Sequence, residues 1–334
     1  MSRMLTASLA RWRKAGTAAL AFARAPAPLR LARLLHRADG ALLQIENTNT
    51  CNYRCTYCPT HSERSLFKVR KGHMTLDTFR AILDRHPRAA LVVIQGQGEP
   101  LMDPGVFEKI AACRERRIAT QIISNGSLLG EAMNERLRRE GPDMLLFSVD
   151  CVSPERNMEE RRGMKYHRVL AGIRALAAGR RAPTRSTRSM RPMVLGLLSI
   201  VHGPFDAEVE AALRSFNGIG LDIVYYKQLN ASYDNRIGGY RAPAVDGIPA
   251  SLRRALDFVV SHQRVARVRP CAQLAYDLPY YLWEGGRTPC CVLNDPRYSA
   301  PEFERDRLLE RYRERRLPGE CERCSFFGGY ERAS

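Results

Sequence analysis

The sequence has no long hydrophobic run and no compositional bias towards disorder. No stretch of about 18 or more apolar residues occurs, and the longest weakly polar stretch, residues 15–23, is too short to span a bilayer. Apolar residues make up 45% of the chain and charged residues 26%, which excludes disordered, collagen-like and low-complexity proteins. The 334 residues suffice for one large α/β domain with a small appendage, or for two mid-sized domains. We therefore predict a soluble protein.

Acidic residues are scarce relative to basic ones. The 53 Lys and Arg against 35 Asp and Glu give a net charge of +18, a field that can recruit nucleic acid, phosphorylated substrates, acidic peptides or an anionic membrane. The alternative is an Arg-rich composition spread over a solvated surface. Most basic residues are scattered and are not interleaved with aromatic ones, so the pattern does not favour nucleic acid as a partner.

Residues 1–40 form a basic N-terminal segment, with eight Lys or Arg and a single acid, Asp39. Regularly spaced leucines predict short amphipathic helices that are interrupted at Pro26 and Pro28. Such a segment can lie on an anionic membrane surface or bind an acidic partner, and its composition also resembles a transit peptide. Packing of a basic helix on the following domain explains the pattern equally well.

Ten cysteines carry more information than the charge. A disulfide framework is typical of small secreted domains, whereas this chain is large and has no recognisable signal peptide. Eight of the cysteines fall into two groups, at 51, 55 and 58 and at 271, 290, 291, 321 and 324. Clustered thiols in a cytoplasmic enzyme more often bind metal. Of the isolated two, Cys113 lies on an apolar helix stripe and is predicted to be a core thiol, and Cys151 is predicted to be packed, with contact to substrate as the alternative.

Strand-like and helix-like patterns alternate from residue 42 to about 230. Strands are predicted at 42–45, 91–94, 120–124, 144–149, 194–201 and 222–226. Amphipathic helices are predicted after Thr75, after 105, and at 131–139, 167–178 and 206–216. Continuous apolar strands that alternate with such helices indicate a parallel sheet covered by helices. The fold class is therefore α/β, a partial (β/α)6 TIM-like barrel whose function resides at the carboxyl ends of the strands.

Less regular segments mark the rest of the chain. A basic loop is predicted at 179–192, a linker at 231–250, and a helix at 252–262. Residues 280–292 are predicted to form a hairpin with a Gly-rich turn. The domains are then a basic N-terminal segment (1–40), a barrel (41–232), a linker and helix (233–264) and a small cysteine-containing domain (265–334). At the ends of the fifth and sixth strands, His202 and Lys227 are candidate substrate contacts.

The first cysteine group follows the first strand directly as Cys51-x3-Cys55-x2-Cys58. Three thiolates on one loop can hold three irons of a [4Fe–4S] cluster and leave the fourth iron without a protein ligand, which is what a reactive site needs. A structural zinc would require a fourth ligand, for which His61 is available.

This spacing, with Tyr57 just before the third cysteine, resembles the radical S-adenosylmethionine (SAM) superfamily. Further motifs follow in order after later strands: Gln97-Gly98-Glu99-Pro100, Ser124-Asn125-Gly126, Ser148-Val149-Asp150 and Arg162-Gly163. In the family, the Gly-Gly-Glu-Pro motif takes the amino group of SAM, and here Gln97 replaces its first glycine. The resemblance assigns SAM binding to Tyr57, Gly98, Glu99, Ser124, Asn125, Ser148, Asp150 and Arg162. Arg161 competes with Arg162 for the SAM carboxylate.

The second cysteine group resembles the SPASM or twitch extension of radical SAM enzymes. Its pattern is Cys271, then Cys290-Cys291 after a Gly-rich turn, then Cys321-x2-Cys324. A full SPASM domain uses seven or more cysteines for two clusters, so the five present imply a twitch-type domain with one auxiliary [4Fe–4S] cluster. Its ligands would be Cys271, Cys290, Cys321 and Cys324, with Cys291 as the alternative to Cys290. A four-thiolate zinc ribbon would use the same residues.

The resemblance implies an enzyme that cleaves SAM to a 5′-deoxyadenosyl radical, which removes hydrogen from a substrate, and that uses an external electron donor such as flavodoxin or ferredoxin. With an auxiliary cluster as acceptor, the net reaction would be a two-electron oxidation of a sugar, cyclitol or related small molecule. A peptide or protein maturase is one alternative, and a zinc-stabilised nucleic-acid-binding protein is an alternative of another class. The expected location is the cytoplasm, with membrane contact through residues 1–40 left open.

Overall fold

The computed structural model describes residues 41–58, 70–180, 193–201, 205–228, 248–262, 269–322, 324, 327, 329 and 330. The predictions for the basic N-terminal segment, for most of the basic loop at 179–192 and for the linker fall outside these residues, as do His61 and His202. Of Lys227, only the backbone is described.

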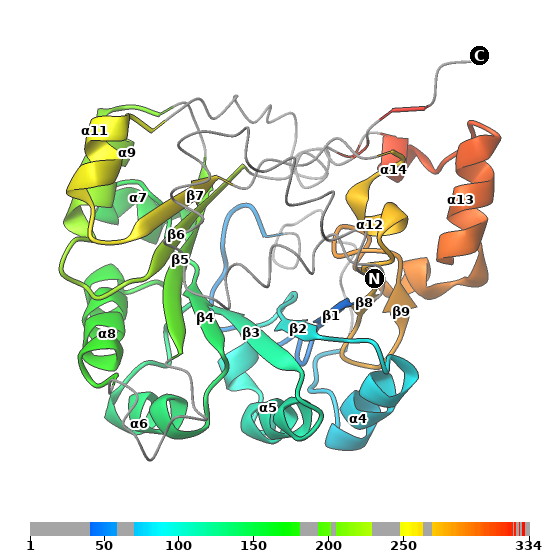
Figure 1. Ribbon diagram of the computed structural model, residues 1–334, viewed down its shortest axis with the longest axis horizontal. Helices are drawn as coiled ribbons and strands as arrows, with labels where there is room; N and C mark the ends of the chain where they lie inside the picture. The colour runs from blue at the N-terminus through cyan, green and yellow to red at the C-terminus, as the bar shows by residue number, and fades with distance from the viewer. Residues whose placement is uncertain are drawn as a thin grey trace, which may run out of the picture.

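The described residues form one open sheet of nine strands, in the order β7-β6-β5-β4-β3-β2-β1-β8-β9. The strands are β1 (Leu42–Ile45), β2 (Leu91–Ile94), β3 (Ala119–Ser124), β4 (Met144–Phe147), β5 (Val194–Val201), β6 (Ile223–Gln228), β7 (Val259–His262), β8 (Tyr280–Tyr281) and β9 (Arg287–Thr288). All neighbours pair in parallel except β8 and β9. Each of the six predicted strands is present to within two residues. The prediction of a partial barrel is confirmed, because the sheet curves into an arc that does not close (Figure 1).

Helices cover the outer face of this arc (Figure 1). They are α4 (Leu76–Arg85), α5 (Val106–Glu115), α6 (Glu131–Glu140), α7 (Pro154–Glu160), α8 (Tyr166–Ala178), α9 (Ala207–Ser215) and α11 (Ala250–Ala255), with the 3-10 turn η1 (Pro100–Met102) after β2. Alternate strand residues divide the core: Leu43 and Val92 join the large cluster beneath the helices, whereas Leu42 and Leu91 join a smaller cluster on the inner face. Thr75 caps α4 as predicted, because its side chain accepts a hydrogen bond from Thr78 N (3.1 Å).

The helix predicted at 252–262 is wrong over its second half. The helix α11 ends at Ala255, and Val259–His262 instead form β7, which pairs in parallel with β6. Asp257 makes the break: its carboxylate accepts a hydrogen bond from Gly218 N (2.7 Å) and its own N–H donates to Asn217 (3.1 Å). The β-branched Val259 and Val260 that follow pack well in a strand.

The tail contains α12 (Ala272–Ala275), the β8–β9 hairpin, the 3-10 turns η3 (Pro296–Ser299) and η4 (Pro301–Phe303), α13 (Arg305–Arg313) and α14 (Gly319–Glu322). The predicted hairpin with a Gly-rich turn is confirmed, and Gly285 has the positive φ of +91° that such a turn requires. β8 also pairs with β1, so the tail extends the barrel sheet. No helix in the described part of the chain is both long and apolar enough to cross a membrane.

Candidate active site

The first cysteine group lies on the loop that follows β1, within residues 46–58. Backbone hydrogen bonds tie this loop to the end of α7: Arg54 N donates to Arg162 O and Thr56 N to Glu160 O, both at 2.8 Å. Cys58 N donates to Cys55 O (3.1 Å), which closes a turn around Thr56 and Tyr57. The cysteine loop is therefore held against the segment 160–162 that follows β4.

The three thiols of this loop influence one another. Burial raises the pKa of Cys51 to about 11 and that of Cys55 to about 12, and the neighbouring Cys58 contributes to both increases. Cys51 Sγ also accepts hydrogen bonds from Tyr53 N (3.5 Å) and Asn125 Nδ2 (3.8 Å). Three thiols on one loop, with N–H groups directed at a sulfur, are the donor set that an iron–sulfur cluster uses. A bound cluster would bring the positive charge that stabilises their thiolate forms.

A buried carboxylate, Glu99, joins the loops that follow β2 and β3. Glu99 is 2% exposed and accepts hydrogen bonds from Ser124 Oγ (2.7 Å), Asn125 N (2.6 Å) and Leu101 N (3.1 Å). Burial nevertheless raises its pKa to about 7. Because Asn125 also reaches Cys51, Glu99 links the second and third motifs to the cysteine loop.

Gly98 sits where its backbone meets the residues just before Cys51. A Cβ at this position would lie 2.4 Å from Thr48 O and 2.7 Å from Thr50 O, which are backbone atoms that cannot move aside easily. Glu99 N donates to Thr50 O (2.8 Å) across the same contact. The sequence Gln97-Gly98-Glu99 is therefore packed directly against the chain that leads into the cysteine loop.

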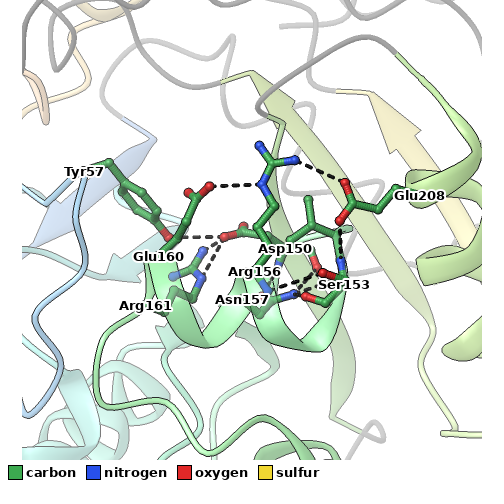
Figure 2. Close-up of polar contacts among 9 residues, drawn as sticks. Tyr57, Asp150, Ser153, Arg156, Asn157, Glu160, Arg161 and Glu208 are labelled. Carbon is green, nitrogen blue, oxygen red and sulfur yellow. Dashed lines mark hydrogen bonds and ion pairs between the residues drawn. The ribbon is translucent and has the colours of Figure 1, made fainter.

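Asp150 and Arg161 form a buried ion pair beside Tyr57 (Figure 2). Arg161 Nε and Nη2 donate to the two carboxylate oxygens of Asp150 at 2.9 and 2.8 Å, a bidentate geometry, and the side chains are 5% and 1% exposed. Asp150 also accepts from Ile200 N (2.7 Å) and Tyr57 OH (3.3 Å). The Arg161 guanidinium lies 5.3 Å from the centre of the Tyr57 ring. Both carboxylate oxygens of Asp150 are thus engaged by the protein itself.

The helix α7 delivers Arg161 to this position, and sequence reasoning missed that helix. Ser153 caps it by accepting from Arg156 N (3.3 Å), and Pro154 occupies its first turn, a combination that the sequence does display. Figure 2 shows Arg156 between Glu160 and Glu208, with salt bridges of 3.2 and 3.1 Å. Arg161 is the C-cap residue of α7, and its side chain is directed at Asp150.

Arg162 and Ser148, the remaining sequence-predicted SAM contacts, occupy different environments. The Arg162 side chain is exposed, and its carbonyl oxygen anchors the cysteine loop. Ser148 is half-buried, and its N–H donates to Ser124 O (2.8 Å). Cys113 is fully buried in the helix-side core, as predicted, and Cys151 is also buried, with its N–H donating to Ser199 Oγ (2.7 Å).

Four tail cysteines that are distant in sequence line one cavity. They are Cys271, Cys290, Cys321 and Cys324, and apolar side chains such as Leu274, Leu308 and Phe327 complete the lining. Backbone N–H groups point at two of the sulfurs, from Leu293 to Cys290 (3.5 Å) and from Gln273 and Leu274 to Cys271. Burial raises the pKa of Cys321 to about 12. Within the described ranges, no three His, Cys, Asp or Glu side chains are close enough to hold a single metal ion.

Glu46 is a buried carboxylate that sequence reasoning did not select. It is 1% exposed, and its Oε2 accepts from Gln97 N (2.7 Å) and from Tyr280 OH (3.2 Å). The available signal was a single charged residue placed directly after the apolar strand β1.

A family model described as the radical SAM superfamily matches residues 45–197. This span contains the three-cysteine loop and all the motifs whose geometry is given above. These residues therefore form a radical SAM domain. The family implies a [4Fe–4S] cluster and SAM as cofactors.

One relative matches the chain over more residues than this span. The chain is 23% identical over 260 residues to the tungsten-containing aldehyde ferredoxin oxidoreductase cofactor-modifying protein of Pyrococcus furiosus, a match that covers 74% of this chain and 70% of that protein. It is 35% identical over 118 residues to the PqqA peptide cyclase of Granulibacter bethesdensis, covering 34% of this chain and 30% of the cyclase.

Among solved structures, Streptococcus suis SuiB bound to its precursor peptide SuiA superimposes with a TM-score of 0.55 at 16% identity, over 80% of this chain and 64% of SuiB. At this identity the likeness establishes the fold. The chain thus spans less than two thirds of the length of SuiB and less than one third of the peptide cyclase.

Proposed function

We propose that the protein is a radical SAM oxidoreductase that oxidises its substrate by two electrons and passes one of them to a second [4Fe–4S] cluster in the tail. The observation that carries the proposal is the single cavity lined by Cys271, Cys290, Cys321 and Cys324. Four thiols drawn from segments up to 53 residues apart would have little reason to converge around one cavity without a shared ligand.

Cys51, Cys55 and Cys58 would hold the first cluster, which supplies the electron for cleavage of SAM and leaves one iron open to it. The chain's own residues would then fix the position of SAM. Asn125, held by Asn52 Oδ1 (2.9 Å) at Cys51, lies beside that cluster loop.

The remaining proposed SAM contacts surround the loop. They are Tyr57, Gly98, Glu99, Ser124, Ser148, Asp150 and Arg162. Because the carboxylate oxygens of Glu99 and Asp150 already accept hydrogen bonds from the protein, these two would act on SAM mainly by holding the surrounding loops in place.

The substrate would be a neutral, polar small molecule such as a sugar or cyclitol. Gln121 and Ser148 lie on the inner face of the sheet by strand alternation, on the same side as the inner apolar cluster. Gln44 and Gln95 lie on this face too, with their amides hydrogen-bonded to each other (3.0 Å). Amides and hydroxyls match the hydrogen-bonding groups of a polyhydroxylated ring and carry no charge.

A peptide is the second candidate substrate. It is favoured by the similarity to the PqqA peptide cyclase and by the fold likeness to SuiB bound to SuiA. Peptide backbones present neutral N–H donors and C=O acceptors, which the inner-face side chains can pair with as well as with hydroxyls.

Iron, sulfide and zinc per chain, measured after reconstitution without oxygen, test the proposal. We compare the wild type with two triple variants, Cys51/Cys55/Cys58→Ala and Cys271/Cys290/Cys321→Ala. About eight irons in the wild type and about four in each variant are expected for two four-iron clusters, with SAM cleavage lost only in the first variant. Zinc retained in the tail, with four irons in the wild type, would refute the second cluster.

The substrate class is tested by deuterium transfer. Deuterated sugars, cyclitols and peptides are offered separately, and mass spectrometry follows deuterium into 5′-deoxyadenosine. Transfer from a peptide alone would replace the small-molecule proposal with the peptide one.

A further inference from the structure

We infer that Glu46 and Tyr280 are positioning residues through which the tail holds the loop Gln97–Gly98–Glu99 in its SAM-binding conformation. The tail would then complete the SAM site, in addition to any cluster that it carries. The inference rests on the proposed role of this loop in binding SAM and is independent of the second cluster.

The carboxylate of Glu46 is the junction between the barrel and the tail. On the barrel side it accepts the hydrogen bond of Gln97 N (2.7 Å), the first residue of the loop. On the tail side it accepts hydrogen bonds from Tyr280 OH (3.2 Å) and from the backbone N–H of Trp283. The backbone of Glu46 repeats the connection, since its N–H donates to Tyr281 O (2.8 Å). Two of the three donors to this carboxylate therefore come from the tail.

Glu46 and Tyr280 pack closely against the chain that leads into the loop. Glu46 and Tyr280 are each 1% exposed. A Cβ on Gly96 would lie 2.5 Å from Glu46 Cγ and 2.7 Å from Tyr280 Oη, so glycine at this position lets the carboxylate and the hydroxyl approach the loop. Because both side chains are buried, they would act on SAM through the loop and not by touching it.

Tyr281, the neighbour of Tyr280 in β8, provides a matched control for a substitution at Tyr280. Tyr280 faces Glu46, whereas the next residue, Tyr281, points to the helix side of the sheet, where its OH is 2.7 Å from His86 Nε2. Tyr→Phe at either position removes one buried hydroxyl from the same two-residue strand. Only the change at Tyr280 removes a hydrogen bond on the path to the loop.

The experiment measures SAM affinity by equilibrium dialysis on anaerobically reconstituted full-length protein, together with the thermal midpoint and the iron content. We expect Tyr280→Phe to weaken SAM binding about fivefold, the effect of one hydrogen bond. Tyr281→Phe should lower the thermal midpoint about as much as Tyr280→Phe does, but it should leave SAM affinity unchanged. Glu46→Ala should weaken binding more than Tyr280→Phe does, and Glu46→Gln, which keeps an acceptor oxygen, should restore most of the affinity.

Gly98→Ala tests the role of the loop in SAM binding separately from the role of the tail. Its Cβ must displace the loop from Thr48, so SAM affinity should fall whether or not the tail contributes. If Gly98→Ala weakens binding while Tyr280→Phe and Glu46→Ala do not, the loop binds SAM and the inference about the tail is wrong. If Gly98→Ala has no effect either, the proposed role of the loop fails, and the inference fails with it. Equal losses of SAM affinity in Tyr280→Phe and Tyr281→Phe would also overturn the inference, since they would reflect general destabilisation.

Discussion

The buried pair of Asp150 and Arg161 offers the sharpest test of how the cysteine loop is supported. Arg161→Met removes the guanidinium and keeps much of its apolar stem. The Asp150 carboxylate, 1% exposed, is then left with the Ile200 N–H and Tyr57 OH as hydrogen-bond donors. Removing one member of a buried ion pair costs about 3–5 kcal/mol of unfolding free energy, because the other charge stays in a low-dielectric interior.

A double-mutant cycle isolates the pair from the loss of packing. Asp150→Leu together with Arg161→Met removes both charges, so the double variant should be more stable than the sum of the two single effects predicts. We expect a coupling energy of about 3 kcal/mol from the bidentate contact. Urea-induced unfolding under anaerobic conditions, followed by tryptophan fluorescence and circular dichroism, gives the four free energies.

Arg162→Met is the control, since this side chain is exposed and adjacent in sequence. Its effect should stay within about 0.5 kcal/mol, as for most surface substitutions. Equal destabilisation by Arg161→Met and Arg162→Met, or additive single effects in the cycle, would refute the assignment of Arg161 as the buried partner.

Three other outcomes follow from particular buried groups. Burial raises the pKa of Glu46 from 4.5 to about 7, against the opposing hydrogen bonds from Gln97, Tyr280 and Trp283. Between these pH values the folded protein binds more protons than the unfolded one, so stability falls as pH rises. Glu46→Gln removes this term, and its unfolding free energy relative to wild type should increase by up to about 3 kcal/mol from pH 4.5 to pH 8 in urea titrations; parallel pH profiles would contradict the shift. Cys113→Ala should cost about 1 kcal/mol and leave the iron content at the wild-type value, whereas lost iron would make Cys113 a ligand. Lys109→Met should lower the free energy of unfolding by about 3–5 kcal/mol, because it removes the positive charge that pairs with the buried Asp103 carboxylate. That carboxylate is 2% exposed and lies 2.8 Å from Lys109 Nζ; an unchanged urea midpoint would show that the pair contributes nothing to stability.

Much of the fold could be predicted because the buried strands are short and strongly apolar. Runs such as Leu91-Val92-Val93-Ile94 are hydrophobic on both faces, which is the pattern of a parallel sheet covered on both sides. β7 was not predicted, because its valines follow a helical pattern and no Gly or Pro separates them from α11. A hydrogen bond from Gly218, 39 residues earlier, ends that helix, and no local pattern contains such information.

In the candidate site, too, the features with a local pattern could be predicted and those that depend on distant residues could not. Cysteine spacing and the motifs after successive strands are local, so the sequence places them at one end of the sheet. Whether Arg161 or Arg162 turns inward depends on the last turn of α7, because adjacent residues point in different directions around a helix end. The choice between Cys290 and Cys291 likewise follows from the hairpin, and Cys290 is the one that lines the cavity. Glu46 was invisible because its partners Gln97 and Tyr280 lie 51 and 234 residues away.

The strand β1 connects the two cysteine groups through the structure. Its carboxyl end leads into the Cys51 loop. One of its edges pairs with β2, and the other pairs with β8 of the tail. Gln44, in the middle of β1, accepts a hydrogen bond from Gln95 Nε2 (3.0 Å) and donates one to Gln273 Oε1 (3.2 Å), and Gln273 lines the tail cavity. Amides carry no titratable charge, so these two hydrogen bonds do not depend on the protonation state of the side chains that make them. Such a connection would suit the proposed transfer of an electron between the two sites, and Gln44 of β1, Gln95 after β2 and Gln273 of α12 provide it.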